Sequence, residues 1–224
     1  MGISEHVLGL KSKKIFAEMF QRLLDRFGPQ HWWPGETPFE VMVGAVLTQN
    51  TSWKNVEKAL ENLKRGGLLS LPALLGLSDA ALAEKIRPAG YFNVKTRRLK
   101  AFLEFLQERY AGDVERMRAR PTERLREELL AVKGIGKETA DSILLYALGH
   151  PIFVVDAYTY RVFTRHFLAP QEAGYDELQE LATDHVPAEA EHYNEFHALL
   201  VSVGKEFCGP KPKCEGCPLE GLNW

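Results

Sequence analysis

The chain has 224 residues, carries 28 Lys and Arg against 30 Asp and Glu, and is 45% hydrophobic. This length can form one large domain or two small intertwined ones, and the hydrophobic share excludes general disorder. The longest apolar stretch, about 41–47, is far too short to cross a bilayer, and the first residues lack the apolar core of a signal peptide. We expect a soluble, cytoplasmic protein.

Helical periodicity runs through nearly the whole chain. Apolar residues recur every three or four positions over 15–27, and Gly28-Pro29 ends this first helix. Residues 39–47 are apolar enough for a buried helix or, taken alone, a strand, but their length and lack of alternation favour a helix. Later helices are expected over 56–63, 71–75, 79–85, 99–110, 123–131, 138–148, 157–167, 175–185 and 193–207. The predicted fold class is therefore all-α.

The most informative stretch, residues 130–140, contains a helix end, a tight Gly-x-Gly turn and the start of a second helix. Two glycines let the backbone approach a phosphate, and the N–H groups of the new helix point toward the anion. An ordinary turn between helices is the alternative, but the lysines on both sides of the turn favour phosphate binding. The predicted DNA-binding residues here are Lys133, Gly134, Gly136, Lys137 and Thr139.

A Val-Asp pair follows at 155–156, directly before a helix that has Arg161 in its second turn. Together with the hairpin, this segment resembles the helix-hairpin-helix (HhH-GPD) DNA glycosylase superfamily, and endonuclease III in particular. Residues 46–51 (Val-Leu-Thr-Gln-Asn-Thr), residues 89–95 and the C-terminal cysteines match the same family. The resemblance therefore covers roughly 15–223, almost the entire chain.

The resemblance implies two helical lobes around a DNA-binding cleft. One lobe is a six-helix barrel over about 30–150, which carries the hairpin, and the other combines 1–29 with 151–224 and its cysteine loop. It also implies base-excision repair, in which a damaged base is flipped out of double-stranded DNA and its N-glycosidic bond is hydrolysed. We expect the protein to act as a monomer.

Asp156 matches the catalytic aspartate of the family. Cleavage of an N-glycosidic bond builds positive charge on the sugar, and a nearby carboxylate stabilises that charge or orients the attacking water. Asp156 also directly precedes a helix, so the simpler interpretation is an N-cap. Both can hold, because capping would keep the carboxylate in place.

Position 138 departs from the bifunctional family members, which carry a lysine there for the Schiff base of strand cleavage. Glu138 cannot form an imine. Lys137 is adjacent, but neighbours on a helix point about 100° apart, so Lys137 is expected to face phosphate. The sequence therefore favours a monofunctional glycosylase. Glu138 is most simply a favourable charge at a helix N-terminus, and a second acid role is the alternative.

Two tryptophans, Trp32 and Trp33, precede the buried helix and offer flat surfaces for an extruded base. Stacking gains value for electron-poor rings such as alkylated purines, whereas packing between the lobes is the alternative for at least one of them. The Trp-Trp-Pro segment, with Gln-Asn-Thr and the missing lysine, is similar to the 3-methyladenine glycosylase branch of endonuclease III-like proteins. Lys205 stands where endonuclease III has arginine, and it either reaches this base pocket or lies on the surface.

Gln49 matches the residue that the family inserts into the gap left by the flipped nucleotide. An amide suits this role because it can pair with an orphaned base in several geometries. A polar residue at the end of a helix is the alternative. Lys95, Arg97 and Arg98 either add phosphate contacts or form a solvated helix face.

The cysteines Cys208, Cys214 and Cys217 are the three in the chain and lie close together. An odd number packed so tightly argues against disulfides and for a metal or cluster site. The family loop has four cysteines, whereas here the first gap is one residue shorter and the fourth position is Asn223. Three thiolates could hold a [4Fe–4S] cluster, with Asn223, water or a small molecule on the fourth iron, or zinc with a further ligand such as His197. An empty loop is the remaining alternative, and we expect a structural cluster.

Three functions remain. The first is a monofunctional glycosylase for alkylated purines such as 3-methyladenine. The second is an endonuclease III-like glycosylase and AP lyase for oxidised pyrimidines, against which Glu138 argues. The third is a non-catalytic binder of DNA structure, against which Asp156 argues. The net charge of −2 gives no global signal for DNA, so the positive charge that binds phosphate must be local.

Overall fold

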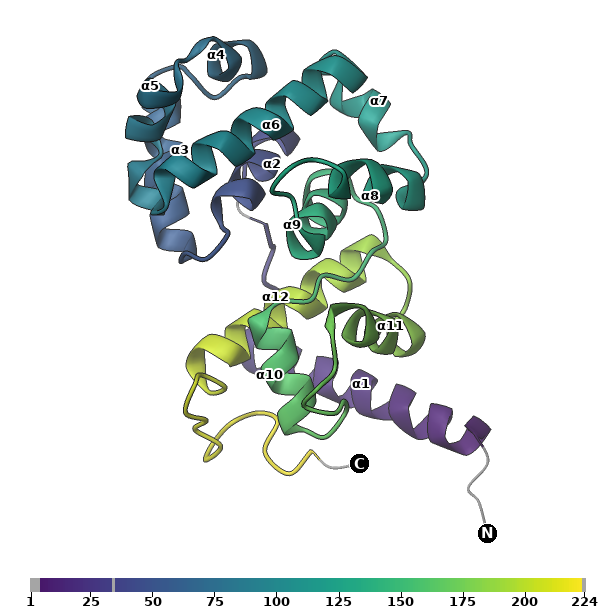
Figure 1. Cartoon of the computed structure of the whole chain (residues 1–224). Helices are drawn as coiled ribbons and strands as arrows, with labels where there is room; N and C mark the ends of the chain where they lie inside the picture. The colour runs from purple at the N-terminus through teal and green to yellow at the C-terminus, as the bar shows by residue number, and fades with distance from the viewer. Residues whose placement is uncertain (1–4, 34, 223–224) are drawn as a thin grey trace. The chain divides into compact units, whose positions relative to one another are not determined.

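Figure 1 shows the computed structural model, which describes residues 5–33 and 35–222, with side chains from residue 13 onward. Helices joined by short turns make up these residues, and no strand occurs among them. This confirms the predicted all-α class. None of the described helices is both long enough and apolar enough to span a membrane.

Contacts within the chain divide it into two compact units. One is continuous, Trp33–His150, and the other is discontinuous, Met1–Trp32 with Pro151–Trp224. The sequence analysis placed the corresponding boundaries at 29/30 and 150/151.

The continuous unit is built around a buried helix. Its elements are α2 (Pro38–Leu47), α3 (Trp53–Arg65), α4 (Leu71–Gly76), α5 (Asp79–Lys85), η1 (Arg87–Ala89), α6 (Phe92–Tyr110), α7 (Val114–Arg118), α8 (Thr122–Leu130), α9 (Lys137–Ser142) and η2 (Ile143–Ala147). Helix α2 packs against α3, α6, α9 and η2, and all of 41–47 is buried. Neighbours on several sides explain why this segment is apolar without a periodic pattern, and they confirm a helix rather than a strand.

Two features define the ends of this unit's key helices. Helix α2 begins where Thr37 Oγ1 accepts the Glu40 N–H at 3.2 Å, with Pro38 in the first turn. The helix expected over 138–148 is α9 followed by η2, a π-helical turn with wider spacing than an α-helix. Tyr146 therefore lies within a π-helical turn rather than in a regular α-helix.

The discontinuous unit contains α1 (Glu5–Phe27), α10 (Ala157–Arg165), α11 (Tyr175–His185) and α12 (Ala190–Glu206). Helix α12 packs against both α1 and α10 (Figure 1). Phe16 joins these helices through edge-to-face contacts with Phe163 and Phe196, whose ring centroids lie 5.3 and 6.2 Å away. Gly204 lets α12 approach α10 closely, because a Cβ atom there would lie 2.2 Å from the ring of Tyr158.

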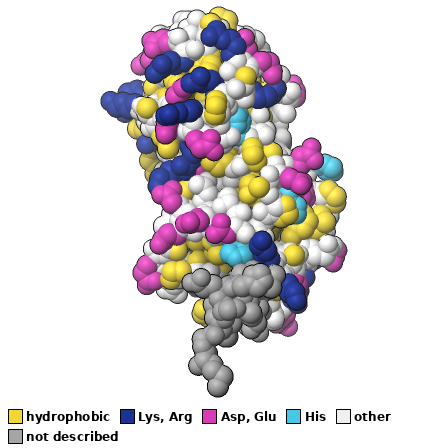
Figure 2. Space-filling view, turned by 90° about the vertical axis from the view of Figure 1, so that its right-hand side faces the viewer, with side chains coloured by type: hydrophobic (Ala, Val, Ile, Leu, Met, Phe, Trp, Pro, Cys, Tyr) yellow, Lys and Arg dark blue, Asp and Glu magenta, His cyan; other side chains and the backbone are white. Residues whose placement is uncertain are grey.

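Surface charges of both signs are mixed. Figure 2 shows Lys and Arg side chains interspersed with Asp and Glu on one face, in agreement with the net charge of −2. Ion pairs at helical spacing, such as Arg118–Glu115 at 2.6 Å and Arg124–Glu127 at 3.0 Å, pair off part of this charge. Positive charge that could attract a ligand must therefore be sought locally.

Candidate active site and cysteine cavity

The predicted hairpin is present in the continuous unit, between α8 and α9. The Ile135 N–H donates to the Val132 carbonyl at 3.0 Å, and both side chains are buried. These two residues fix the turn from within. The residues exposed around it are Lys133, Gly134, Gly136 and Lys137.

The two glycines of the turn have different surroundings. Gly134 has φ +92°, and a Cβ atom there would lie 2.4 Å from Cγ of Arg98. Gly136 has φ −96°, and a Cβ atom there would meet nothing within 4 Å. Gly134 is thus required by the protein's own packing, whereas the space beside Gly136 is open to a ligand.

Gln49 anchors the chain after α2 to this turn. Its Nε2 donates to the Gly134 carbonyl at 3.1 Å and to Oγ1 of Thr139 at 3.0 Å, while Nη1 of Arg98 donates to its Oε1. Thr139 is only 6% exposed. Its hydroxyl oxygen thus accepts a hydrogen bond from Gln49 inside the protein, and its contact with DNA stays a prediction.

Lys95 is buried, which corrects the expectation that it contacts phosphate or lies on a solvated face. The residue is 1% exposed, and its Nζ donates to the carbonyls of Leu47 at 2.8 Å and Ala89 at 2.7 Å. Burial, and to a smaller degree the charge of Arg98, lowers the pKa of Lys95 to about 8. The side chain ties the end of α2 to η1 and so fixes the segment that carries Gln49.

Trp33 lies against two other aromatic rings of the continuous unit. It meets Trp53 edge to face at 4.8 Å between ring centroids, and Tyr146 at 4.9 Å with the planes tilted by 40°. Gly44 leaves room for this cluster, since a Cβ atom there would lie 3.3 Å from the Trp53 ring. All three rings are partly exposed. Trp53 and Tyr146 were not among the predicted site residues, because their contacts join positions far apart in the sequence.

Trp32, the neighbour of Trp33, belongs to the discontinuous unit. The Nζ of Lys205 lies 5.5 Å from the centroid of its ring, a cation–π contact. Lys205 therefore lies beside one of the two predicted tryptophans, and the half-buried indole carries a positive charge over one face.

Asp156 is the N-cap of α10. Its Oδ1 accepts hydrogen bonds from the N–H groups of Tyr158 at 2.9 Å and Thr159 at 2.8 Å, and from Thr159 Oγ1 at 3.1 Å. Its Oδ2 lies 3.7 Å from Nε2 of His197, and burial lowers the pKa of this histidine although the Asp156 charge opposes the shift. One oxygen thus fixes the side chain, while the other lies beside an imidazole that stays neutral at physiological pH.

Glu138 lies in the first turn of α9, next to Lys137, and both side chains are exposed. A negative charge at this end of a helix is favourable. Glu138 is therefore an exposed carboxylate at the start of α9.

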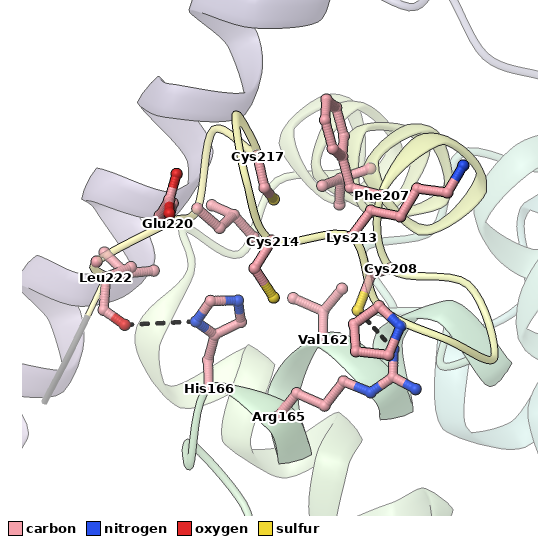
Figure 3. Close-up of a pocket in the computed structure, with 14 residues that line it drawn as sticks. Val162, Arg165, His166, Phe207, Cys208, Lys213, Cys214, Cys217, Glu220 and Leu222 are labelled. Carbon is pink, nitrogen blue, oxygen red and sulfur yellow. Dashed lines mark hydrogen bonds between the residues drawn. The ribbon is translucent and has the colours of Figure 1, made fainter.

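The three cysteines line one cavity of about 200 Å³ in the discontinuous unit (Figure 3). None of them forms a disulfide. Arg165 holds the loop at Cys208, since its Nη1 donates to Sγ at 3.1 Å and to the Gly209 carbonyl at 2.7 Å. Burial raises the pKa of the Cys217 thiol. Three soft donors therefore face a common space.

The sequence also predicted two further ligands for a metal or cluster in this loop, Asn223 and His197. Asn223 lies outside the described residues, and His197 is not among the residues that line the cavity. His166, which the sequence analysis did not single out, does line it. No three His, Cys, Asp or Glu side chains within 13–33 and 35–222 converge closely enough to hold a single metal ion.

Comparison with known proteins shows the family of this chain. Residues 43–188 match the family model described as HhH-GPD superfamily base excision DNA repair protein. A Methanocaldococcus jannaschii protein, assigned by its name to the DNA repair glycosylases, is 48% identical over 92% of this chain and 94% of its own. Endonuclease III of Haemophilus influenzae is 32% identical over 83% of each chain.

Solved structures agree with this assignment. The H. pylori 3-methyladenine DNA glycosylase, bound to 1,N6-ethenoadenine, has a TM-score of 0.71 and 34% identity and covers 87% of this chain and 97% of its own. An endonuclease III–DNA complex, at 22% identity and a TM-score of 0.81 over 94% of each chain, shows the same fold. The chain therefore belongs to the HhH-GPD superfamily of base excision repair proteins. Within that family it is a DNA glycosylase.

The open space at Gly136 allows a test of DNA binding that leaves the fold intact. Gly136→Ala should raise the Kd for duplex DNA about tenfold, which is about 1.4 kcal/mol, because its Cβ would occupy the phosphate approach. The free energy of unfolding should change by less than about 0.5 kcal/mol. Fluorescence anisotropy at fixed salt and urea unfolding measure the two quantities.

Gly134→Ala provides the contrast, since its positive φ and the contact with Arg98 should lower the free energy of unfolding by about 1 kcal/mol or more. An unchanged Kd for Gly136→Ala would remove the turn from the DNA interface.

Replacing Lys95 with methionine should lower the free energy of unfolding by about 2 kcal/mol, because two buried carbonyls lose their donor. The difference in the free energy of unfolding between wild type and Lys95→Met should grow as the pH rises from about 8 toward 10.5. In that window the unfolded chain still binds a proton that the folded lysine has lost, so wild-type stability increases with pH. Urea unfolding at several pH values measures both effects.

The exposed Lys58, replaced with methionine, is the matched control and should show neither effect. If the free energies of unfolding of wild type and Lys95→Met differ by the same amount at every pH, the lowered pKa of Lys95 is contradicted.

Proposed function

We propose that this glycosylase hydrolyses the N-glycosidic bond of an alkylated purine, such as 3-methyladenine, and leaves the DNA strand uncut. The observation that carries the proposal is Glu138, which stands where bifunctional relatives have their Schiff-base lysine. The similarity at 34% identity to a 3-methyladenine DNA glycosylase, solved with an ethenoadenine ligand, supports the same substrate class.

Asp156 is the proposed catalytic residue. With Oδ1 held by three hydrogen bonds, Oδ2 presents a negative charge in a fixed direction. Such a preorganised carboxylate stabilises the positive charge that builds on the sugar as the base departs, and it orients the attacking water. Because the chain's own hydrogen bonds have already fixed the carboxylate, little reorganisation is needed during the reaction.

The base pocket is proposed to contain the predicted tryptophans and two rings found with them. Trp33, Trp53 and Tyr146 form one partly exposed aromatic cluster, and Trp32 carries Lys205 over its ring. A flipped alkylated purine is flat, polarisable and electron-poor, so aromatic faces give it a stacking contact that is tolerant of its exact substituent.

DNA binding is proposed to rest on the hairpin. Its backbone N–H groups, with Lys133 and Lys137, contact phosphate, and Gly136 permits the close approach. In this arrangement Gln49 has two roles. Its amide bonds the turn in the free protein, and it would release those bonds to fill the gap left by a flipped nucleotide. We further propose that a cytoplasmic monomer acts on double-stranded DNA.

A [4Fe–4S] cluster is the proposed occupant of the cysteine cavity. The donors fit, because three thiols line one space and the guanidinium of Arg165 adds positive charge beside the Sγ of Cys208. Cys208, Cys214 and Cys217 would bind as thiolates. The cluster would supply a rigid cross-link for the loop rather than redox chemistry in base removal.

A second candidate is an endonuclease III-like glycosylase and AP lyase acting on oxidised pyrimidines. It is supported by the 32% identity to endonuclease III of Haemophilus influenzae. A non-catalytic DNA binder is the third reading to be separated from these two.

Duplexes that each carry one lesion separate the three, and Asp156→Asn adds the test of the catalytic residue. Wild type should release alkylated purine, with strand cleavage appearing only after alkali. Asp156→Asn should bind the same duplex with a Kd within about twofold yet excise at least about 100-fold more slowly. Excision near the wild-type rate would overturn the assignment of Asp156, and binding without any base release would favour the non-catalytic binder.

Borohydride trapping tests the absence of a lyase. Bifunctional enzymes form an imine between lysine and C1′, and reduction of that imine gives a permanent protein–DNA crosslink. With Glu138 at the lysine position, wild type should give little or no crosslink on abasic DNA, as measured by denaturing gel. A known bifunctional glycosylase is the positive control, and Glu138→Lys is the gain-of-function variant. Efficient trapping of the wild type would instead support the endonuclease III-like candidate.

A further inference from the structure

His166 is one of the side chains around the cysteine cavity. It follows directly on Arg165 at the end of α10, and it lines the same space as Cys208, Cys214 and Cys217. Figure 3 shows its ring between Leu222 and Cys214. We propose that His166 is the fourth protein ligand of the cluster and binds iron through Nε2. This rests on the cluster proposed above.

The orientation of the ring carries the proposal. Nδ1 of His166 lies 3.4 Å from the carbonyl oxygen of Leu222. A carbonyl can only accept, so Nδ1 carries the proton and Nε2 carries the lone pair. Metal-ligating histidines show this arrangement regularly, with one ring nitrogen on the metal and the other donating to a carbonyl or carboxylate. The Leu222 carbonyl thus selects the tautomer that a ligand needs.

The other polar side chains around the cavity suit a cluster less well. Arg165 and Lys213 are cationic donors, and Arg165 already bonds Sγ of Cys208. Glu220 offers a carboxylate, which iron–sulfur sites seldom use, and its Oε2 already accepts the Gly216 N–H at 3.1 Å. Among the described residues that line the cavity, the remaining metal-binding donor is the neutral imidazole of His166, a type of ligand that suits iron.

No three His, Cys, Asp or Glu side chains among the described residues group closely enough to hold one metal ion. The three cysteines and His166 nevertheless line the same cavity of about 200 Å³. In a four-iron cluster each ligand binds a different iron, so the donors stand apart around a larger group. Three thiolates and one imidazole around a shared cavity match that demand.

The experiment uses the full chain reconstituted anaerobically with iron and sulfide, with histidine labelled by 15N in one sample. Iron and acid-labile sulfide should each reach about four per chain. Pulsed EPR of the reduced cluster should show a nitrogen hyperfine coupling that changes from the 14N to the 15N pattern in the labelled sample. Neither readout depends on base excision.

Three variants identify which residue supplies the nitrogen that couples to the cluster. His166→Cys keeps a fourth soft donor, so it should retain four irons, lose the histidine coupling and lower the reduction potential, because an anionic thiolate replaces a neutral imidazole. Asn223→Ala should change nothing. His192→Ala, a half-buried histidine of the same unit that stacks on Phe20 away from the cavity, is the matched control and should keep the coupling. Circular dichroism verifies that each variant is folded.

The outcomes distinguish the two proposals. Four irons without a histidine coupling, or a coupling that survives in His166→Cys, would overturn the role of His166 while leaving the cluster. One zinc per chain, or no metal after reconstitution, would overturn both. Loss of iron in Asn223→Ala, together with a histidine coupling that is absent from the wild type, would assign the fourth ligand to Asn223 instead.

Discussion

A single buried ammonium group organises the proposed DNA-facing part of the continuous unit. Lys95 reaches from α6 to the last carbonyl of α2 and to the carbonyl of Ala89, so it fixes two backbone ends at once. Gln49 lies two residues beyond the end of α2, and Arg98 lies about one turn further along α6 than Lys95, so both start from positions that this lysine sets. Their mutual hydrogen bond and the bonds of Gln49 to the hairpin then fix the turn. Desolvating a cation is costly, and the two carbonyls offset that cost.

The discontinuous unit uses a carboxylate in a comparable way. Asp156 caps the start of α10 with one carboxylate oxygen, and its other oxygen is thereby held at a defined position. The last turn of the same helix contains Arg165, and His166 follows directly after it. One helix of nine residues therefore links the proposed catalytic carboxylate to the proposed cluster ligand. Placement at the two ends of one helix gives both groups more precise positions than a loop would.

The sequence predicted the elements far better than the contacts. Helices over 79–85 and 175–185 have the bounds expected, because apolar periodicity and local caps determine them. Helix α6 begins seven residues earlier than expected, since residues 92–98 are mostly polar and join the helix through tertiary contacts. The burial of Lys95 and the pairing of Trp33 with Trp53 and Tyr146 depend on long-range packing, which no local pattern encodes. Cysteine spacing pointed to the loop, but the position of His166 beside it arises from the fold.

The π turn η2 has a consequence for how substrate preference can diverge. A π turn is in effect an α-helix that has accepted one additional residue, and such turns are frequent at functional sites. Loss of one residue within Ile143–Ala147 would restore regular helical spacing and rotate the side chains on one side of it by about 100°. Tyr146 would then turn away from Trp33, and a different side chain would take its place. A one-codon deletion could thus exchange an aromatic wall of the proposed base pocket while the helix itself survives.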